Sequence, residues 1–283
     1  MNEKTQVTLP TIAMLGAGSM ARAILAGLLA PHVSVDGPVR VTNRSAENAA
    51  SFDNEPRVQA WATAADSEAN LKAVESAQIV LVAVKPAMVP DLLDEISPAL
   101  TEGAIVVSVA AGVTTATMEA HLPAHVSVIR TMPNTPSKIG LGVTGICAGT
   151  RSTPEQLELI CSMFSTVGEV IVLPENKIDA LGSISGSGPA YVFYVIEQLT
   201  KVAMEHGFSA DQAQTMVQGT FRGAVELLAQ SGEEPQELRR QVTSPKGSTE
   251  RAIAVFDEAD IKDIFLRGTQ AAIARSEEMA RGQ

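Results

Sequence analysis

Short apolar runs alternate with stretches of helical spacing through the first 174 residues of the chain. Each run is rich in β-branched residues and is followed by Gly, Pro or polar residues, as strands commonly are. Starting at residues 11, 39, 58, 79, 104, 127, 142 and 169, the runs read TIAMLGAG, VRVTNR, VQAWA, IVLVAVK, AIVVSVAAG, SVIRTMP, GVTGICAG and EVIVLP. A continuous run such as IVLVAV is typical of a strand buried on both faces. The alternation therefore predicts an α/β fold with a parallel, doubly wound sheet of the Rossmann type.

The spacing becomes wholly helical after about residue 175. In SGPAYVFYVIEQLTKVAMEHG, five apolar residues fall on one helix face, namely Val192, Val195, Ile196, Leu199 and Val202. Gly207 is expected to end this helix, and Ser209 with Gln212 matches a capping box that begins the next one. We therefore predict two domains, with the sheet in residues 1–174 and an all-helical second domain in residues 175–283.

Composition and charge narrow the class of protein. The chain has 283 residues, 45% of them apolar, which is enough for two domains with a substantial core. With a formal net charge of −11, the chain lacks the overall positive charge typical of a nucleic-acid-binding protein, and an anionic membrane surface would repel it. No apolar run approaches the ~20 residues that span a bilayer, and the N-terminus has no apolar signal core. We therefore expect a cytoplasmic protein that holds anionic ligands by local positive potential.

The cysteines indicate neither a redox motif nor a metal site. Cys147 and Cys161 are the only two, and they form no CxxC or metal-ligand spacing. We expect both to be reduced core residues, and we expect no metal.

A dinucleotide-binding motif occupies the first apolar run. In IAMLGAGSMARAIL, Gly16, Gly18 and Ala21 fill the G-x-G-x-x-G/A positions between an expected strand and an expected helix. Gly16 allows the tight turn, Gly18 lets a pyrophosphate approach the backbone, and Ala21 keeps helix and strand close. The free N–H groups at the start of the helix suit the phosphates. A glycine turn alone would be a weak signal, but at the start of an alternating α/β chain it predicts dinucleotide binding.

The end of the next strand bears on which dinucleotide is bound. NAD sites usually have Asp or Glu there to bind the ribose 2′-hydroxyl. This chain has Asn43, Arg44 and Ser45 instead, and no acidic residue before Glu47. A guanidinium and a hydroxyl suit a 2′-phosphate, so NADPH is favoured while NADH is left open. The alternative interpretation is that Arg44 is a solvated loop residue.

Two further strand ends are expected at the same crevice, because ligands bind beyond the carboxyl ends of parallel strands. The run IVLVAVK ends in Lys85 before Pro86, and the run AIVVSVAAG ends in Ala110, Ala111 and Gly112. The small residues leave room for a flat ring against the backbone. Lys85 is either a contact of the cofactor or a surface lysine, and the sequence favours neither.

Six motifs in a fixed order give the chain a family resemblance: GAGSMA, AVKP, SVAAGV, RTMPNTP, SGSGPAYVF and VTSPKGSTERA. From about residue 11 to residue 280 the chain resembles pyrroline-5-carboxylate reductases, which reduce a cyclic imine to proline with NAD(P)H. The resemblance implies a homodimer formed through the C-terminal helices, and some members of the family assemble several dimers into a ring. It also implies the following cofactor contacts, the last of them near the reacting ring: Leu15, Gly16, Ala17, Gly18, Ser19, Met20, Asn43, Arg44, Ser45, Ala83, Val84, Lys85, Pro86, Val109, Ala110, Ala111 and Asn134.

The stretch VTSPKGSTERAI, residues 242–253, runs from a loop into an expected helix, whose N-terminus suits a carboxylate. The resemblance implies that this loop holds the substrate at the dimer interface, with Gly247, Ser248 and Thr249 around the carboxylate. It also places the Thr249 hydroxyl on the ring nitrogen, which makes Thr249 the implied catalytic residue. A protonated imine needs no dedicated His or carboxylic acid. Lys246 stands where the family commonly has Gly, and it either strengthens carboxylate binding or points to water.

Two other functions are compatible with the same fold. A related imine reductase or 3-hydroxyacid dehydrogenase would use a lysine of the helical domain as proton donor, and Lys177 and Lys201 are candidates without a matching motif. A non-catalytic NADP-sensing protein would bind the cofactor without turnover, but it would need no Ser-Thr substrate loop.

Overall fold

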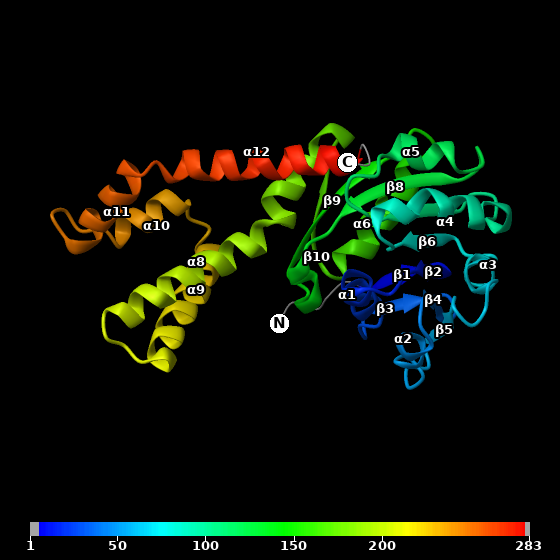
Figure 1. Cartoon of the computed structure of the whole chain (residues 1–283), viewed down its shortest axis with the longest axis horizontal. Helices are drawn as coiled ribbons and strands as arrows, with labels where there is room; N and C mark the ends of the chain where they lie inside the picture. Colours follow the sequence, from blue (N-terminus) through cyan, green and yellow to red (C-terminus); the bar gives the residue numbers. More distant parts are fainter. Residues whose placement is uncertain (1–5, 281–283) are drawn as a thin grey trace. The chain divides into compact units, whose positions relative to one another are not determined.

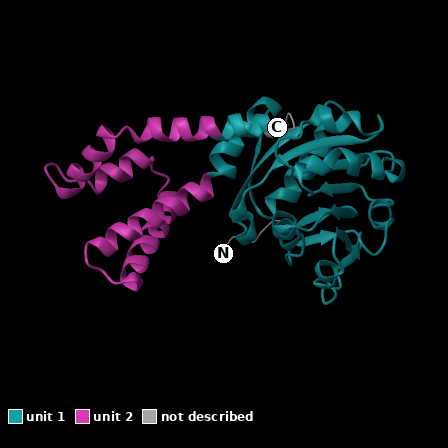
Figure 2. Ribbon diagram, in the orientation of Figure 1, with its two compact units in different colours: residues 1–187, 272–283 teal, residues 188–271 magenta. Residues whose placement is uncertain are grey.

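A computed structural model describes residues 6–280 of the chain (Figure 1). The chain divides into two compact units: residues 1–187 with 272–283 form unit 1, and residues 188–271 form unit 2 (Figure 2). Unit 1 contains the β-sheet, and unit 2 is helical.

Unit 1 is built on an eight-stranded sheet in the order β10-β9-β8-β7-β6-β2-β4-β5. The strands are β2 (Ile12–Leu15), β4 (Val39–Asn43), β5 (Val58–Ala62), β6 (Ile79–Val82), β7 (Ile105–Ser108), β8 (Ser127–Met132), β9 (Gly142–Ala148) and β10 (Gly168–Val172). Each of the eight predicted apolar runs coincides with one of them, to within one residue at the start of β10, so the predicted doubly wound fold is confirmed. Strand order reverses between β2 and β6, which is where ligands bind in such sheets.

The sheet departs from the predicted parallel pattern at one edge. Six strands are parallel, but β9 pairs antiparallel with β8, and β10 pairs parallel with β9. A parallel neighbour needs a crossover of about a dozen residues or more, usually a helix. The connection between β8 and β9 is residues 133–141, and it holds only the short 3-10 helix η3 (Thr135–Ile139). The chain therefore turns back and runs antiparallel.

Helices pack on both faces of this sheet. Along β2, Ile12 and Met14 belong to one buried cluster and Ala13 and Leu15 to another, as alternating side chains of a doubly covered strand do. The elements that complete unit 1 are β1 (Val7–Leu9), α1 (Ser19–Leu28), β3 (Val33–Val35), α2 (Ala46–Ala50), α3 (Ala69–Val74), η1 (Pro86–Met88), α4 (Val89–Ile96), η2 (Ser97–Ala99), α5 (Thr115–Ala120), α6 (Pro154–Ser165), η4 (Glu175–Lys177), α7 (Ile178–Leu181) and η5 (Gly182–Gly186). β1 and β3 pair in a small parallel sheet that the sequence did not predict, since three residues give too little periodicity.

The two cysteines have the character expected of reduced thiols in or near a core. Both are free; Cys147 is buried and Cys161 is half-buried. Removal from water raises the pKa of both thiols above the ordinary value. Both side chains are therefore protonated at neutral pH.

Arg130 on β8 is a buried cation that joins several elements of unit 1. Its side chain is 2% exposed and lies 2.8 Å from Asp179 Oδ1 and 3.4 Å from Glu175 Oε1. The Glu175 carboxylate also accepts hydrogen bonds from the backbone N–H and the hydroxyl of Thr115, at 2.7 and 2.6 Å. Ser276 near the end of the chain donates its hydroxyl to Asp179 at 3.1 Å. The network fixes β8, α5, η4 and α7 to one another.

The remaining helices are α8 (Gly188–Glu205), α9 (Ala210–Ser231), α10 (Pro235–Gln241), α11 (Ser248–Glu258) and α12 (Ile261–Ala280). The predicted capping box of α9 is present: Ser209 accepts from the Gln212 N–H, and the Gln212 side chain accepts from the Ser209 N–H. Gly207, just after α8, has the left-handed conformation expected of a helix end, with φ of 91°. Among the described residues, no helix combines the length and the apolar character that crossing a bilayer requires.

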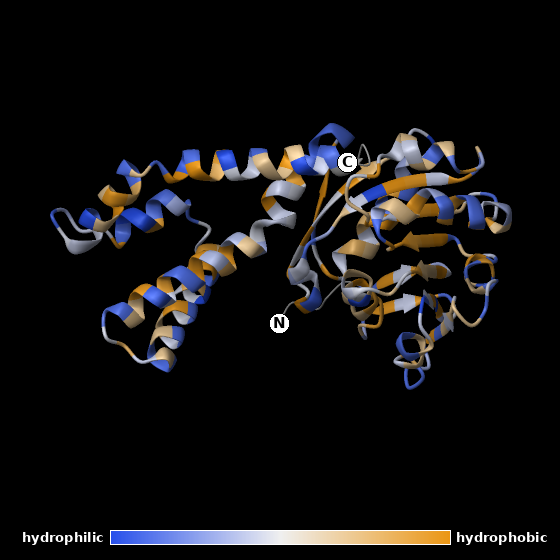
Figure 3. Ribbon diagram, viewed as in Figure 1, coloured by the Kyte–Doolittle hydropathy of each residue, from blue (hydrophilic) through white to orange (hydrophobic). Residues whose placement is uncertain are grey.

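Unit 2 leaves apolar side chains uncovered by its own chain. Figure 3 shows hydrophobic positions along α8 and α9 as well as in the strands of unit 1. On α8 the exposed apolar residues are Val192, Phe193, Tyr194, Val195, Leu199, Val202 and Met204. Four of the five positions predicted to form one apolar face are among them. An exposed apolar face of this kind marks a site of interaction with another molecule.

Candidate active site

The glycine loop, residues 16–20, lies where β2, β4 and β6 end. The Gly16 N–H donates to Thr42 O at 3.1 Å, and the Ala83 N–H donates to Leu15 O at 2.9 Å. Gly16 has φ of +90°, and a Cβ built there would lie 2.9 Å from Ala83 O and 3.0 Å from Val84 Cγ1. Only glycine suits both this backbone conformation and this close approach. The loop is therefore held against the strands next to the point where strand order reverses.

Gly18 faces open space at the start of α1. It is the N-cap of this helix, and a Cβ built on it would meet no atom within 4 Å. No side chain caps α1, and its first turn contains no acidic residue. The first N–H groups of a helix have no partner within it, so those around Ser19 and Met20 are available to an anion. Ala21 behind them is fully buried against the core. The loop thus fits the pyrophosphate of a dinucleotide.

The three residues predicted to read the ribose lie at the end of β4. Asn43 is buried, and its Nδ2 lies 3.5 Å from Asn48 O. Arg44 is exposed, and Ser45 caps α2 by accepting from the Asn48 N–H at 3.3 Å. The Ser45 hydroxyl hydrogen is not used by that bond and can still be donated. This turn therefore offers a cation and a hydroxyl.

The ends of β6 and β7 lie at the same edge of the sheet as the glycine loop, because β2, β6 and β7 are parallel neighbours. Lys85 is exposed and precedes Pro86, which begins η1 as predicted. The Val109 N–H donates to Val82 O at 3.1 Å, and the Ala110 N–H donates to Ser108 Oγ at 3.1 Å. The predicted cofactor contacts that this edge brings together are Leu15, Gly16, Ala17, Gly18, Ser19, Met20, Asn43, Arg44, Ser45, Ala83, Val84, Lys85, Pro86, Val109, Ala110 and Ala111.

The side chain of Asn134, which is expected beside the reacting ring, makes hydrogen bonds within the protein. Its side chain is buried, donates from Nδ2 to Ser185 O at 3.0 Å, and accepts at Oδ1 from the Val143 N–H at 2.8 Å. These bonds hold the residues after β8 against β9 and η5. Its structural role is to position this segment, and contact between its side chain and a ligand stays a prediction.

The predicted substrate loop, residues 242–249, leads into α11 in unit 2. Gly247 is the N-cap of α11, and Ser248 and Thr249 are exposed in its first turn. The Gly247 N–H is already donated to Ser244 O at 2.9 Å, so it is not free for a substrate. A Cβ at Gly247 would lie 2.9 Å from the same carbonyl oxygen, which explains the glycine. The backbone donors left for a carboxylate are those of the first turn of α11.

Lys246 and Glu250 shape this loop in ways that the sequence did not indicate. Lys246 has φ of +62°, in the left-handed region where glycine is favoured. Its backbone N–H donates to Glu250 Oε2 at 2.8 Å. Glu250 therefore restrains the loop while placing a negative charge near the donors of α11. A glycine would adopt this left-handed conformation without strain.

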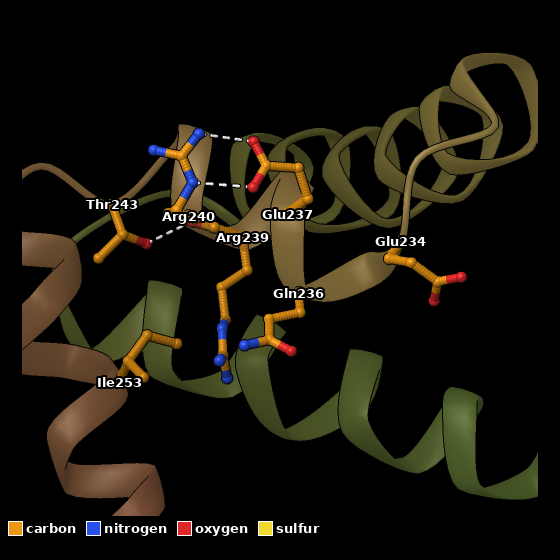
Figure 4. A pocket seen from close by; sticks show the side chains of 7 residues that line it. All are labelled: Glu234, Gln236, Glu237, Arg239, Arg240, Thr243 and Ile253. Carbon is orange, nitrogen blue, oxygen red and sulfur yellow. Dashed lines mark hydrogen bonds and ion pairs between the residues drawn. The ribbon is translucent and has the colours of Figure 1, made fainter.

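A separate hollow of about 490 Å³ lies between α10 and α11 (Figure 4). Arg240 and Glu237 pair on one side of it at 2.6 and 2.8 Å, and Arg239 and Gln236 point the other way. Hydrogen bonds from Arg240 and then Gln241 hold the pKa of Glu237 at about 2. None of the predicted substrate-binding residues lines this hollow, so its size alone does not make it the active site.

Comparison with known proteins extends over almost the whole chain. The family model for pyrroline-5-carboxylate reductase dimerisation matches residues 175–279, and a model for coenzyme F420-dependent NADP oxidoreductases matches residues 11–112. A pyrroline-5-carboxylate reductase of Corynebacterium melassecola is 36% identical, with 96% of this chain and 99% of the relative aligned. The enzyme of the same name from Pseudomonas aeruginosa is 35% identical, with 96% and 97% aligned.

Solved structures show the same similarity. The pyrroline-5-carboxylate reductase of Coxiella burnetii superposes with a TM-score of 0.86 at 33% identity, covering 95% of this chain and 97% of that one. The Plasmodium falciparum pyrroline carboxylate reductase, solved with NADP bound, shares the fold with a TM-score of 0.81 at 22% identity, covering 95% and 98%.

Proposed function

The chain belongs to the pyrroline-5-carboxylate reductase family, and we propose that it reduces the C=N bond of 1-pyrroline-5-carboxylate to give L-proline. The observation that carries this proposal is the match to curated reductases along nearly their full length. The reaction is an NAD(P)H-dependent oxidoreduction and completes proline biosynthesis. Both recognisable parts of such an enzyme, the glycine loop and the Ser-Thr loop before α11, are present in this chain.

A nicotinamide dinucleotide fits the site at the carboxyl ends of the parallel strands. Gly18 leaves the space that a pyrophosphate needs, and the first turn of α1 supplies unpartnered N–H groups without a nearby acidic residue of its own. Arg44 and Ser45 would hold the adenosine end, and Ala110 and Ala111 would leave room for the nicotinamide end. The absence of an acidic residue at the end of β4 supports NADPH as the preferred cofactor.

The residues around α11 would orient the imine. The Ser248 and Thr249 N–H groups would bind the substrate carboxylate, and the Thr249 hydroxyl would bind the ring nitrogen, as the family resemblance implies. The reduced nicotinamide supplies the hydride when it is bound. Reduction places this hydride on the carbon of the C=N bond, and the nitrogen of the protonated imine keeps its proton and becomes a secondary amine. The chain therefore contributes chiefly orientation, for which reacting atoms held near ~3–3.5 Å suffice.

The second part of the chain would form the dimer. The dimerisation model matches residues 175–279, and the apolar side chains exposed on α8 and α9 supply a surface for a second copy. We assign residues 1–174 to cofactor binding and residues 175–283 to dimerisation and substrate binding. A ring built from such dimers and a cytoplasmic location complete the proposal.

The test is turnover with a defined product. Purified protein is mixed with 1-pyrroline-5-carboxylate and either NADPH or NADH, and loss of nicotinamide absorbance is followed together with formation of proline. Proline formed in amounts equal to the cofactor oxidised supports the proposal. NADPH binding without proline formation would instead favour another imine or hydroxyacid substrate, or a sensing role.

A further inference from the structure

Arg22, the fourth residue of α1, ties the glycine loop to the segment after β4. Its Nε–H donates to Ala17 O at 3.2 Å, within the glycine loop. Its Nη2 lies 2.9 Å from Ser51 Oγ and 3.4 Å from Asn48 O. The guanidinium also lies over the ring of Phe52, 4.6 Å from its centroid. One planar cation thus contacts two separate parts of the proposed cofactor site, the glycine loop and the segment after β4.

The contacts of Arg22 converge with those of the residues expected to read the ribose. Asn48 O, which faces Arg22, also accepts from Ser51 Oγ at 2.7 Å and faces Asn43 Nδ2 at 3.5 Å. The Asn48 N–H in turn donates to Ser45 Oγ. Because these groups all meet at the backbone of Asn48, a change at Arg22 is transmitted to the turn that contains Arg44 and Ser45. The position of this turn therefore depends on Arg22.

The charge of Arg22 is not neutralised by the protein. Within residues 6–280, no carboxylate lies within ion-pair distance of its guanidinium, and Nη1 has no hydrogen-bond partner. Stacking on Phe52 and half-burial hold the guanidinium in place, which suits its weak hydration. A phosphate monoester carries about −1.5 to −2 charges near pH 7, more than Arg44 alone balances. A second fixed cation at this end of the site favours a cofactor with a 2′-phosphate.

We propose that Arg22 is a positioning residue that determines cofactor specificity: it fixes the Asn43–Ser45 turn and adds positive charge for the adenosine 2′-phosphate. The inference rests on the cofactor site proposed above. It assigns to α1 a role in choosing NADPH over NADH, in addition to the role of its N-terminus in binding the pyrophosphate that both cofactors share.

Direct binding tests this assignment without any catalytic step. Adenosine 2′,5′-bisphosphate and AMP are titrated calorimetrically into wild type, Arg22→Met and Arg22→Lys, and NADPH and NADH are titrated by fluorescence. We expect Arg22→Met to weaken the two 2′-phosphorylated ligands roughly tenfold while AMP and NADH change less than about twofold. Arg22→Lys keeps the charge but not the planar fork, so it should fall between. Raising the ionic strength should narrow the difference.

Two further variants separate specificity from folding. Ser51→Ala leaves Arg22 intact but removes its closest acceptor, and it should weaken the 2′-phosphorylated ligands selectively, by roughly two- to threefold. Arg57→Met is the matched control, because Arg57 precedes β5 at the opposite end of the sheet and also donates to a backbone carbonyl, Leu29 O. It should change neither class of ligand.

The outcomes that overturn the inference differ from those that overturn the function. Equal weakening of all four ligands by Arg22→Met would reduce Arg22 to a support of the glycine loop, and unchanged binding would remove it from the site. Failure of the wild-type protein to bind either NADPH or NADH would overturn the proposed cofactor site itself.

Discussion

Thr249 combines exposure with a place in the first turn of α11, where backbone donors are free. If its hydroxyl binds the ring nitrogen, Thr249→Ala removes a hydrogen bond to a charged group. Such bonds contribute about 1.5–3 kcal/mol, so turnover with 1-pyrroline-5-carboxylate should fall by roughly 10- to 100-fold. NADPH binding should stay within about twofold, since the proposed cofactor site lies at α1 and not at α11. Thr249→Ser keeps the hydroxyl and serves as the control; kinetics of Thr249→Ala equal to wild type would remove Thr249 from the site.

Arg44 is exposed at the end of β4, in a turn without an acidic residue. Arg44→Ala should weaken NADPH by about 10- to 100-fold, since it removes a charge-assisted contact with the 2′-phosphate. NADH lacks that phosphate and should bind as before. Fluorescence titration of both cofactors measures the ratio. Equal losses of affinity for NADPH and NADH would mean that Arg44 does not contact the 2′-phosphate. Arg44 would then be the solvated loop residue that the sequence also allowed.

The loop before α11 contains a residue in a conformation that costs energy. A non-glycine residue in the left-handed region is disfavoured by about 1–2 kcal/mol, and Lys246 has φ of +62°. In Lys246→Gly the relief of this strain is only partly offset by about 0.4–1 kcal/mol of extra unfolded-state entropy, so thermal stability should stay level or rise slightly. Lys246→Val puts a β-branched residue there and should lower the melting temperature by a few degrees. Thermal melting curves of wild type, Lys246→Gly and Lys246→Val test this prediction. A Lys246→Val variant as stable as wild type would show that the backbone at this position is not strained.

Arg130 connects four elements from a buried position on β8, flanked by Glu175 and Asp179. Arg130→Met leaves two carboxylates without their cation, and removal of one partner from a buried ion network costs about 3–5 kcal/mol. We expect the lower end of that range, because both carboxylates keep partial access to water. Urea unfolding of the full-length protein measures the change.

The matched control for Arg130 is Arg267→Met. Arg267 pairs with Asp263 at 2.7 Å on the exposed surface of α12, so its loss should cost less than about 1 kcal/mol. Similar shifts for the two variants would show that the Arg130 network contributes no more than a surface ion pair.

Local signals predicted the elements better than their arrangement. The eight strands were predictable because most are short apolar runs with β-branched residues, bounded by turn residues. The start of α9 was predictable because Ser209 and Gln212 form a complete capping box. The direction of β9 was not, since it depends on the short connection from β8 rather than on the residues of β9.

Contacts between distant residues explain what the sequence missed in the candidate site. The proposed role of Arg22 depends on its hydrogen bond to Ser51, 29 residues later. The Asn134 amide is occupied by a hydrogen bond to Ser185, 51 residues later. Sequence motifs identify the residues around the proposed cofactor site. The distant residues that hydrogen-bond to them determine which of their side-chain groups remain free for a ligand.

At the scale of the whole molecule, the proposed dimer depends on the exposed apolar side chains of α8, Phe193 among them. Phe193 is 66% exposed within its own chain, so Phe193→Asp removes little packing there, yet it would bury a charge between two subunits. We expect this variant to lose the dimer and, with it, turnover, because the substrate loop is implied to lie at that interface. NADPH binding should persist, since the glycine loop belongs to unit 1. Light scattering after size-exclusion chromatography should give an even multiple of the chain mass for wild type and the single-chain mass for Phe193→Asp.

Ser34→Asp adds the same charge at an exposed position of β3 in unit 1, and it should leave assembly and turnover unchanged. An intact assembly in Phe193→Asp would show that the subunit contact does not include Phe193. A single chain that still forms proline would be the more serious result, because it would separate catalysis from dimerisation. The substrate loop of unit 2 would then have to act within one chain, and the exposed apolar residues of α8 would need another explanation.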